Sequence, residues 1–277
     1  MPELPEVETV RRGLEPILLD RVLTRVEQRR PDLRIPFPLD FVARIEGRRV
    51  QALRRRAKYL LFDFDDGAVM IAHLGMSGRM LVRAKGSNAM PEAHDHVLFV
   101  TDKGDSIVFN DARRFGLMTL TTRADEPQHE LLRHLAPDPT ELCFTGEHLA
   151  ARLAGKRTPV KAALLDQTVV GGVGNIYASE ALYRARISPR RLAQSVKGRR
   201  AERLAGAVRD VIDEAILAGG SSLRDYVQTS GELGYFQHSW RVYDREGEPC
   251  RTPACHGVVK RIVQSNRSTF YCGICQR

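Results

Sequence analysis

The N-terminal residues Met1-Pro2-Glu3 could do covalent chemistry, because removal of Met1 would expose the secondary amine of Pro2. Attack of such an amine on the anomeric carbon of a sugar gives an iminium ion, which accepts electrons without a further proton. An α-amine titrates near ~7.7 to 8.0, so a useful fraction is neutral at cellular pH. A helix starting just beyond Pro2 would lower this pKa, whereas Glu3 would raise it and could carry protons to the opened sugar. Taken alone, the same residues also fit an ordinary helix start, with proline and acids in the first turn.

A second group with chemical potential is a set of cysteines. Four of the five cysteines fall in the last 28 residues: Cys250 and Cys255 are separated by four residues, sixteen more precede Cys272, and two precede Cys275. Two cysteine pairs at such spacing can close a tetrahedral thiolate cage around zinc. The apolar residues between the pairs fit a β-hairpin that needs the metal as a staple, so we expect one structural zinc ion with no open coordination position. His256 is an alternative ligand in place of one cysteine.

The charge of the chain indicates a polyanionic partner. Lysine and arginine number 43 against 34 acidic residues, which gives a formal net charge of +9, and arginine greatly outnumbers lysine. Arginine suits sites that grip phosphates with a planar fork of donors, so nucleic acid is the leading candidate. An arginine-rich genome is the alternative explanation for the same composition.

The hydrophobic pattern predicts an α+β protein in several parts. Apolar residues at helical spacing over residues 3 to 18 predict one amphipathic helix, and period-two patterns from about 22 to 122 predict an antiparallel β-sandwich with a short helix near 39 to 46. Further helices are expected near 146–154, 159–166, 174–185 and 199–218. The expected parts are a catalytic domain over 1–124, a linker over 125–145, a helical domain over 146–237 that includes a functional loop over 219–235, and a cysteine hairpin over 238–277.

Five motifs in order give the chain a family resemblance. They are the N-terminal Pro-Glu-Leu-Pro-Glu-Val-Glu, His73-Leu-Gly-Met-Ser-Gly78, Asp111-Ala-Arg-Arg-Phe-Gly116, Gly172-Val-Gly-Asn-Ile-Tyr-Ala178 and the cysteine hairpin. The sequence resembles formamidopyrimidine-DNA glycosylase from end to end. The resemblance implies a base-excision-repair enzyme that removes 8-oxoguanine and formamidopyrimidines from double-stranded DNA and then nicks the strand as a lyase. It also implies a helix-two-turn-helix DNA-binding domain and a zinc-finger hairpin. Many members have two residues between the first two cysteines where this chain has four, which leaves the local shape of the knuckle open.

The resemblance assigns the catalytic residues. Pro2 would form the Schiff base, Glu3 would shuttle protons, and Lys58 would serve the lesion's phosphate and the proton transfers of β-elimination. Alone, Lys58 would be interpreted as a solvated cation that opens a strand. Arg267, five residues before Cys272, would reach the lesion's phosphates and assist δ-elimination. Glu6, one helical turn from Glu3, is a further carboxylate at the same helix end.

The resemblance also implies residues that replace the extruded base. A damaged base inside a duplex is out of reach, so the enzyme must flip it out and fill the hole. Met76 would be an adaptable plug, Phe115 a wedge between base steps, and Arg113 a donor to the widowed base that favours cytosine. Without the resemblance, Met76 and Phe115 could be core residues of a sheet, but the neighbouring glycines favour exposed tips.

Four more residues are expected at the DNA. Asn175 lies at an expected helix N-terminus, where it and the backbone amides could hold a phosphate. Lys156 and Lys161 would add positive charge to the same domain, and His94 matches a DNA-contacting position of the family although alone it would be a surface histidine. The 219–235 loop fits a mobile segment that closes over the extruded base.

Two other functions fit part of the sequence. An endonuclease VIII-like glycosylase for oxidised pyrimidines usually carries glycine where this chain has Leu4, and lacks the methionine, arginine and phenylalanine set. A non-catalytic nucleic-acid-binding zinc protein would explain the charge but not the trio Pro2, Glu3 and Lys58. The acidic N-terminus does not resemble a secretory signal, and no apolar run approaches the ~18 residues of a membrane span. We therefore expect a cytoplasmic, bacterial-type monomer that associates with the nucleoid through DNA.

Overall fold

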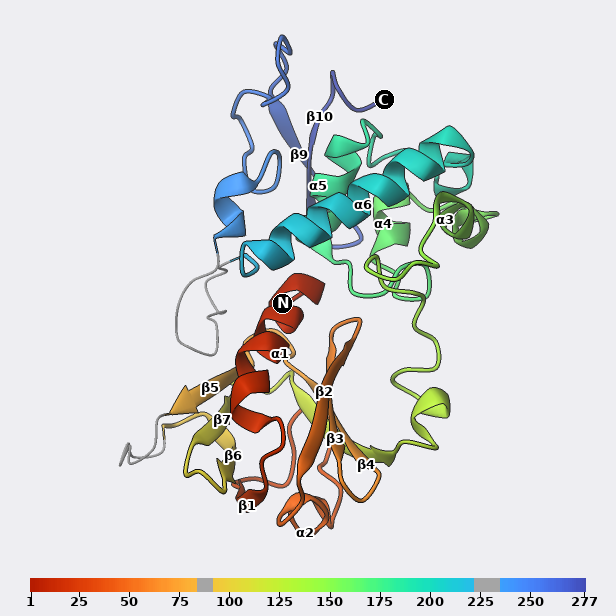
Figure 1. The fold of residues 1–277 in the computed structure, drawn as a ribbon. Coiled ribbons are helices and arrows are strands. Elements are labelled where there is room, and N and C mark those ends of the chain that lie inside the picture. The colour runs from red at the N-terminus through yellow and green to blue at the C-terminus, as the bar shows by residue number, and fades with distance from the viewer. Residues whose placement is uncertain (84–91, 222–234) are drawn as a thin grey trace. The chain divides into compact units, whose positions relative to one another are not determined.

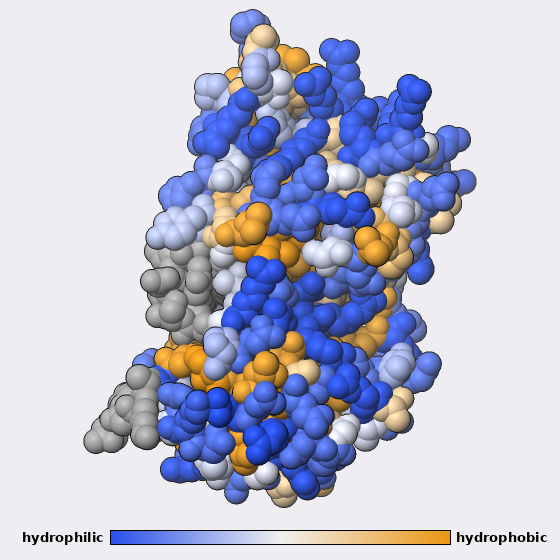
Figure 2. All heavy atoms as spheres, in the orientation of Figure 1, coloured by the Kyte–Doolittle hydropathy of each residue, from blue (hydrophilic) through white to orange (hydrophobic). Residues whose placement is uncertain are grey.

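The protein is described by a computed structural model that covers residues 1–83, 92–221 and 235–277. The chain forms two compact units: Met1–Arg133 with Ala218–Tyr235, and His134–Leu217 with Phe236–Arg277. Figure 2 shows that hydrophilic residues cover most of the visible face of each unit. No helix of the described residues is long and apolar enough to cross a membrane.

The first unit opens with the expected amphipathic helix, α1 (Leu4–Leu18). Most of its apolar stripe is buried: Val7, Leu14 and Leu18 belong to the core of this unit, and Ile17 is partly buried against it. Pro5 stands at the start of the helix, where its missing N–H costs nothing. Pro16 lies in the last turn, and the helix ends two residues later.

Two four-stranded antiparallel sheets form the body of the first unit (Figure 1). One sheet has the order β1-β6-β7-β5, with β1 Leu23–Gln28, β6 Asp95–Thr101, β7 Ser106–Asn110 and β5 Arg79–Arg83. The other has the order β2-β3-β4-β8, with β2 Val50–Arg56, β3 Tyr59–Phe64, β4 Ala68–His73 and β8 Leu117–Thr122. The expected sandwich with a short helix is confirmed, the helix being α2 (Phe41–Ile45). The connections β4–β5 and β7–β8 each pass from one sheet to the other.

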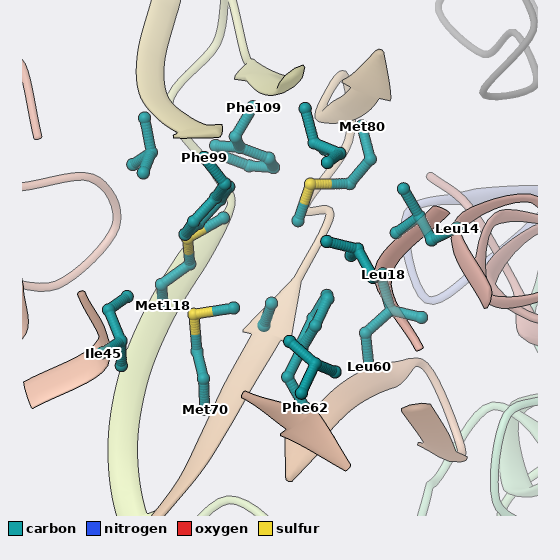
Figure 3. Packing of buried hydrophobic residues seen from close by; sticks show 14 of the residues in the cluster. Leu14, Leu18, Ile45, Leu60, Phe62, Met70, Met80, Phe99, Phe109 and Met118 are labelled. Atoms are coloured by element: carbon teal, nitrogen blue, oxygen red, sulfur yellow. The ribbon is translucent and has the colours of Figure 1, made fainter. Parts of the chain in front are cut away.

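The core of the first unit fills the space between these layers. Figure 3 shows side chains of α1, Leu14 and Leu18, pointing toward the same core as Phe99 and Met118 from the two sheets. The methionines are unbranched and fill irregular gaps between the rings. Strand β4 is buried along its whole length, so its period-two pattern does not separate a core face from a solvent face.

The second unit contains the expected helices: α3 (Gly146–Leu153), α4 (Val160–Leu164), α5 (Asn175–Arg184) and α6 (Arg199–Leu217). Helix α6 packs against α3 and α5 through an apolar stripe that includes Leu204, Val208 and Val211. Short 3₁₀ turns lie at Glu126–Gln128 in the first unit and at Ala193–Ser195 and Phe236–Ser239 in the second. The strands β9 (Val259–Gln264) and β10 (Arg267–Cys272) form the expected antiparallel hairpin.

A buried carboxylate fixes residues 241–243, which precede that hairpin in the chain. Glu180 on α5 is fully buried and accepts hydrogen bonds of 2.8–3.0 Å from the backbone amides of Arg241, Val242 and Tyr243. Val242 in turn belongs to a small core with Phe270 and two of the hairpin cysteines. Because an unsatisfied buried carboxylate would be costly, these amides hold residues 241–243 firmly against α5.

The packing of α1 predicts a stability effect. Replacing the fully buried Leu14 by alanine should lower the free energy of unfolding by about 2–5 kcal/mol, because a large cavity would remain between α1 and the sheets. Leu39→Ala, at a fully exposed leucine, should change it by no more than about 0.5 kcal/mol. Urea unfolding followed by circular dichroism measures both. Equal effects of the two variants would contradict the packing of α1 described above.

Candidate active site and nucleic-acid interface

The N-terminus of α1 is held in a buried setting. Pro2 and Glu3 are both buried, and the backbone amide of Glu3 donates a 2.8 Å hydrogen bond to Oε2 of Glu6. The other carboxylate oxygen of Glu6 accepts a 2.8 Å hydrogen bond from the amide of Ser221. Glu6 therefore joins the first turn of α1 to the last described residue before 222–234. The expected capping loop falls largely on 222–234, which lie outside the described residues.

Lys58 lies in the tight turn between β2 and β3. Arg56 pairs with Tyr59, so the turn consists of Ala57 and Lys58, and Ala57 has a positive φ of 50°. Arg55 fixes this turn, because its Nη1 donates to the carbonyl oxygen of Ala57 at 3.1 Å while its Nε contacts Oε2 of Glu8 at 3.1 Å. Glu8 belongs to α1, about one turn from its start. One guanidinium thus ties the Lys58 turn to the helix that carries Pro2 and Glu3.

A cavity of about 370 Å³ in the first unit gathers the same region. Its lining residues are Met1, Arg34, His73, Gly75, Met76 and Phe115. It therefore brings together the residue before Pro2 and two of the expected filling residues. Sequence reasoning gave no role to Arg34 or His73, although His73 begins one of the motifs.

His73 is a neutral group in this cavity. It is buried, and its Nδ1 accepts a 2.9 Å hydrogen bond from the amide of Gly75. Burial, and then the positive charges of Lys58 and Arg34, lower the pKa of His73 to about 4. Its ring also packs at 5.0 Å from that of Tyr59, its cross-strand partner. The sequence signal for His73 was a histidine at the end of an otherwise apolar strand, two residues before the glycine whose amide binds it.

The filling residues lie on two neighbouring loops, 74–78 and 111–116. Phe115 is 46% exposed, and the guanidinium of Arg113 lies 4.9 Å from the centre of its ring. Met76 is half-buried. A Cβ added to Gly75 would come within 2.3 Å of the Phe115 carbonyl carbon, so the two backbones touch there. His94, also expected at DNA, is exposed, and its carbonyl accepts a hydrogen bond from Asp111.

In the second unit, Lys161 is fully buried. Its ammonium donates to Oδ1 of Asn175 at 2.5 Å, to the carbonyl of Ser268 at 2.8 Å and to the hydroxyl of Thr269 at 2.8 Å. Asn175 is the first residue of α5, and its amide also donates to the Ser268 carbonyl at 3.1 Å. Lys161 therefore joins α4, the N-terminus of α5 and the start of β10.

Arg267 comes directly before the residues that this network holds. It is exposed and opens β10 after the turn Ser265-Asn266, in which both residues have positive φ as a two-residue hairpin turn requires. Lys156, by contrast, lies nearer the surface and forms a 3.4 Å ion pair with Asp166. The structure thus places Lys156, Lys161, Asn175 and Arg267 in the second unit, whereas the other expected DNA contacts belong to the first.

The four hairpin cysteines converge as expected. Their sulfur atoms all lie within 4.8 Å of one another, with Cys250–Cys275 at 3.7 Å and Cys255–Cys272 at 3.8 Å. Zinc–sulfur bonds of about 2.3 Å in a tetrahedron require sulfur separations of about 3.8 Å, so the set fits a metal ion. Backbone amides also approach two of the sulfurs, that of Thr252 at 3.5 Å from Cys250 and that of Gly257 at 3.4 Å from Cys255. His256 is not part of the cluster found among the described residues.

Comparison with known proteins agrees with this geometry. Residues 1–118 match the model of the formamidopyrimidine-DNA glycosylase N-terminal domain, and residues 135–227 match that of the formamidopyrimidine-DNA glycosylase H2TH domain. The formamidopyrimidine-DNA glycosylase of Paracoccus denitrificans is 58% identical over 283 residues, which cover 100% of both chains.

Solved structures give the same result. The crystal structure of the MutM (Fpg) protein of Thermus thermophilus has 42% identity and a TM-score of 0.87, covering 99% of this chain and 98% of that one. A mutant Fpg of Lactococcus lactis in complex with DNA that contains Fapy-dG has 30% identity and a TM-score of 0.89 over 100% of both chains. With both domain models and a full-length relative in agreement, this chain belongs to the formamidopyrimidine-DNA glycosylase family.

Proposed function

We propose that this chain removes oxidised purines from double-stranded DNA and cleaves the resulting abasic site, with the amine of Pro2 as nucleophile. The observation that carries the proposal is the cavity beside the N-terminus of α1, because it combines Met1 with the basic residue Arg34 and the loop residues Met76 and Phe115. Removal of Met1 frees the Pro2 nitrogen next to this space. The DNA complex of the Lactococcus relative, which contains Fapy-dG, supports the same substrate class.

The proposed reaction begins with attack of the neutral Pro2 nitrogen on C1′ of the damaged nucleoside. The glycosidic bond between C1′ and the base nitrogen breaks, and the base leaves with a proton. The sugar ring then opens to an iminium ion between C1′ and the Pro2 nitrogen as the ring oxygen takes a proton. Loss of a C2′ proton then expels the 3′ phosphate, and a second elimination expels the 5′ phosphate. Hydrolysis of the remaining imine returns the amine.

Three buried ionisable groups near Pro2 are candidates for these proton transfers: His73, Glu3 and Lys58. With a pKa of about 4, His73 is neutral at pH 7, so it is a poor acid for the reaction. We assign proton delivery at the sugar oxygen to Glu3, which starts the same helix as Pro2, and the elimination steps to Lys58. Arg267 is assigned to the phosphate that leaves by δ-elimination.

We assign the filling of the vacated space to Met76, Arg113 and Phe115, whose loops lie at the cavity. Arg113 presents donors that match the acceptors of an unpaired cytosine, which supports a preference for lesions opposite cytosine. His94, Lys156 and Asn175 are assigned to the DNA backbone. The buried Lys161 acts indirectly, by fixing Asn175 and the start of β10. Capping of the extruded base stays assigned to the 219–235 segment, of which 222–234 lie outside the described residues.

The cysteine cluster is proposed to hold one structural zinc ion. Four thiolates leave no open coordination position, so the ion would order the hairpin that carries Arg267 rather than react itself. We further propose that the enzyme works as a monomer in the bacterial cytoplasm and associates with the nucleoid through DNA.

The Pro2 mechanism predicts a trapped covalent complex. Borohydride should reduce the iminium and link the chain lacking Met1 to duplex DNA that contains 8-oxoguanine, giving a band of slower mobility on a denaturing gel. The same chain with an N-terminal tag, in which the Pro2 nitrogen is an amide, should give no such band. Equal trapping with the tagged chain would place the nucleophile elsewhere. A panel of duplexes with oxidised purines or pyrimidines opposite each base would test the substrate class.

The buried environment of His73 predicts its titration. In ¹H–¹⁵N spectra its imidazole should stay neutral from pH 8 down to pH 5, and His73→Gln should remove and so assign its signals. Between about pH 6.5 and about pH 4 the unfolded chain binds a proton at His73 that the folded chain does not, so this group lowers stability as the pH falls through that window. A titration midpoint above pH 6 would contradict the assignment of His73 as a neutral group.

The cysteine cluster predicts one bound zinc ion per chain, which elemental mass spectrometry of the purified protein would measure. Cys272→Ser should lower that content and weaken binding to lesion DNA at least tenfold, because the hairpin would lose its staple. Cys143→Ser, at an exposed cysteine outside the cluster, should keep both the metal and the affinity. An unchanged zinc content in Cys272→Ser would exclude the proposed ligand set.

A further inference from the structure

The two loops that carry the filling residues share a buried polar link. Asp111 is fully buried, and its Oδ2 accepts a 2.8 Å hydrogen bond from the amide of Gly116 at the far end of its own loop. Its Oδ1 accepts a 2.5 Å hydrogen bond from the hydroxyl of Ser77 in the other loop. The Ser77 oxygen in turn accepts a 3.1 Å hydrogen bond from the amide of Arg113. The Ser77 hydroxyl thus accepts a hydrogen bond from a backbone amide of the 111–116 loop and donates one to a carboxylate of the same loop.

Strand pairing explains why the link can form. Each loop passes between the two sheets: 74–78 leads from β4 to β5, and 111–116 leads from β7 to β8. The strands before and after the loops pair with one another, β4 with β8 up to His73↔Leu117 and β5 with β7 up to Arg79↔Asn110. The two crossovers therefore run side by side at one end of the sandwich.

The backbones of the two loops are also in close contact. A Cβ on Gly75 would meet backbone atoms of Phe115 and Gly116 at 2.3–2.6 Å, and Gly75 also has a positive φ of 64°. A Cβ on Gly116 would lie 2.7 Å from the ring of Phe109 and 2.9 Å from the His73 carbonyl. Only glycine allows this approach at either position, so the loops are packed together by backbone as well as by side chains.

Asp111 is itself anchored to β6. The ring of His96 donates from Nε2 to the Asp111 carbonyl at 2.8 Å, and the Asp111 amide donates to the carbonyl of His94 at 3.0 Å. Its backbone and both of its carboxylate oxygens are therefore held. The carboxylate has a fixed position from which it orients Ser77 and the end of its own loop.

We propose that Ser77 and Asp111 are positioning residues that join the two loops into one insertion unit. Met76 and the pair Arg113 and Phe115 then enter the duplex together and in a fixed relative position. This link keeps Arg113 in a fixed orientation toward the base opposite the lesion while Met76 enters the duplex. An Arg113 that moved independently of Met76 would meet that base in varied orientations. The proposal rests on the proposed function of the three filling residues.

The test compares two substrates of one enzyme. Excision of 8-oxoguanine opposite cytosine in a duplex requires the vacated space to be filled, whereas cleavage of an abasic site in single-stranded DNA does not. Under single turnover, Ser77→Ala should lower the ratio of the first rate to the second at least tenfold, and should reduce the preference for cytosine over adenine at least threefold. Ser77→Thr, which keeps the hydroxyl, should recover most of both values. Ser106→Ala on β7 is the matched control and should leave the ratio unchanged.

A second variant guards against simple misfolding. Asp111→Asn keeps the shape of the side chain and can still accept from Gly116 through its one oxygen, but an NH₂ donor then faces the Ser77 hydroxyl in place of the acceptor Oδ1. It should also lower the ratio and the preference, with thermal unfolding recorded alongside. If Ser77→Ala and Asp111→Asn lower both rates equally, or leave the ratio and the preference unchanged, the positioning role is overturned.

The filling residues are tested in the same assay so that the two ideas fail separately. Met76→Ala and Arg113→Ala should lower the ratio if these side chains fill the space. If they do not lower it, the assignment of the filling residues fails, and the inference fails with it. If they lower it while Ser77→Ala behaves like the unaltered chain, the filling assignment stands and only the link between the loops is excluded.

Discussion

The geometry of the N-terminal site depends on one buried ion pair, Arg55 with Glu8. Arg55 is 8% exposed and Glu8 11%, so both charges are largely removed from water. Because the same guanidinium also holds the Ala57 carbonyl, it connects the helix of Pro2 and Glu3 with the turn of Lys58. Arg11 and Arg12 also pair with Glu8, so Glu8 would keep charged partners without Arg55, but the link between the helix and the turn would be lost.

Buried polar groups do comparable work in the rest of the molecule. Glu6 ties the first turn of α1 to Ser221, Glu180 holds residues 241–243, and Lys161 joins α4 and α5 to β10. Glu6 and Glu180 fix irregular segments, whereas Lys161 fixes the N-terminus of α5 and the start of β10. An apolar contact resists separation but allows sliding, whereas a charged group with several donors or acceptors fixes a direction. The sandwich core supplies the stability, and these groups supply the positions.

The cavity beside α1 shows how electrostatics divides labour among neighbouring groups. His73, Lys58 and Arg34 are all basic residues, and burial together with the two cations keeps the imidazole neutral. Two positive charges therefore remain near a neutral imidazole, which accepts a hydrogen bond from the amide of Gly75. A third cation would add repulsion without adding a proton donor suited to neutral pH.

The sequence by itself determined the α+β architecture, the order of the helices, the hairpin and the four-cysteine cluster, because these follow from local periodicity and from spacing along the chain. It also pointed to Pro2, Glu3 and Lys58 through motifs. The tertiary structure alone showed that Lys161 is buried, that His73 and Arg34 line the cavity, and that Ser77 bonds to Asp111. These facts arise from contacts between residues far apart in sequence: Lys161 meets Ser268, and Ser77 meets Asp111. A lysine looks the same in a sequence whether it faces water or three acceptors of the protein, so only the packing of the elements around it could distinguish the two.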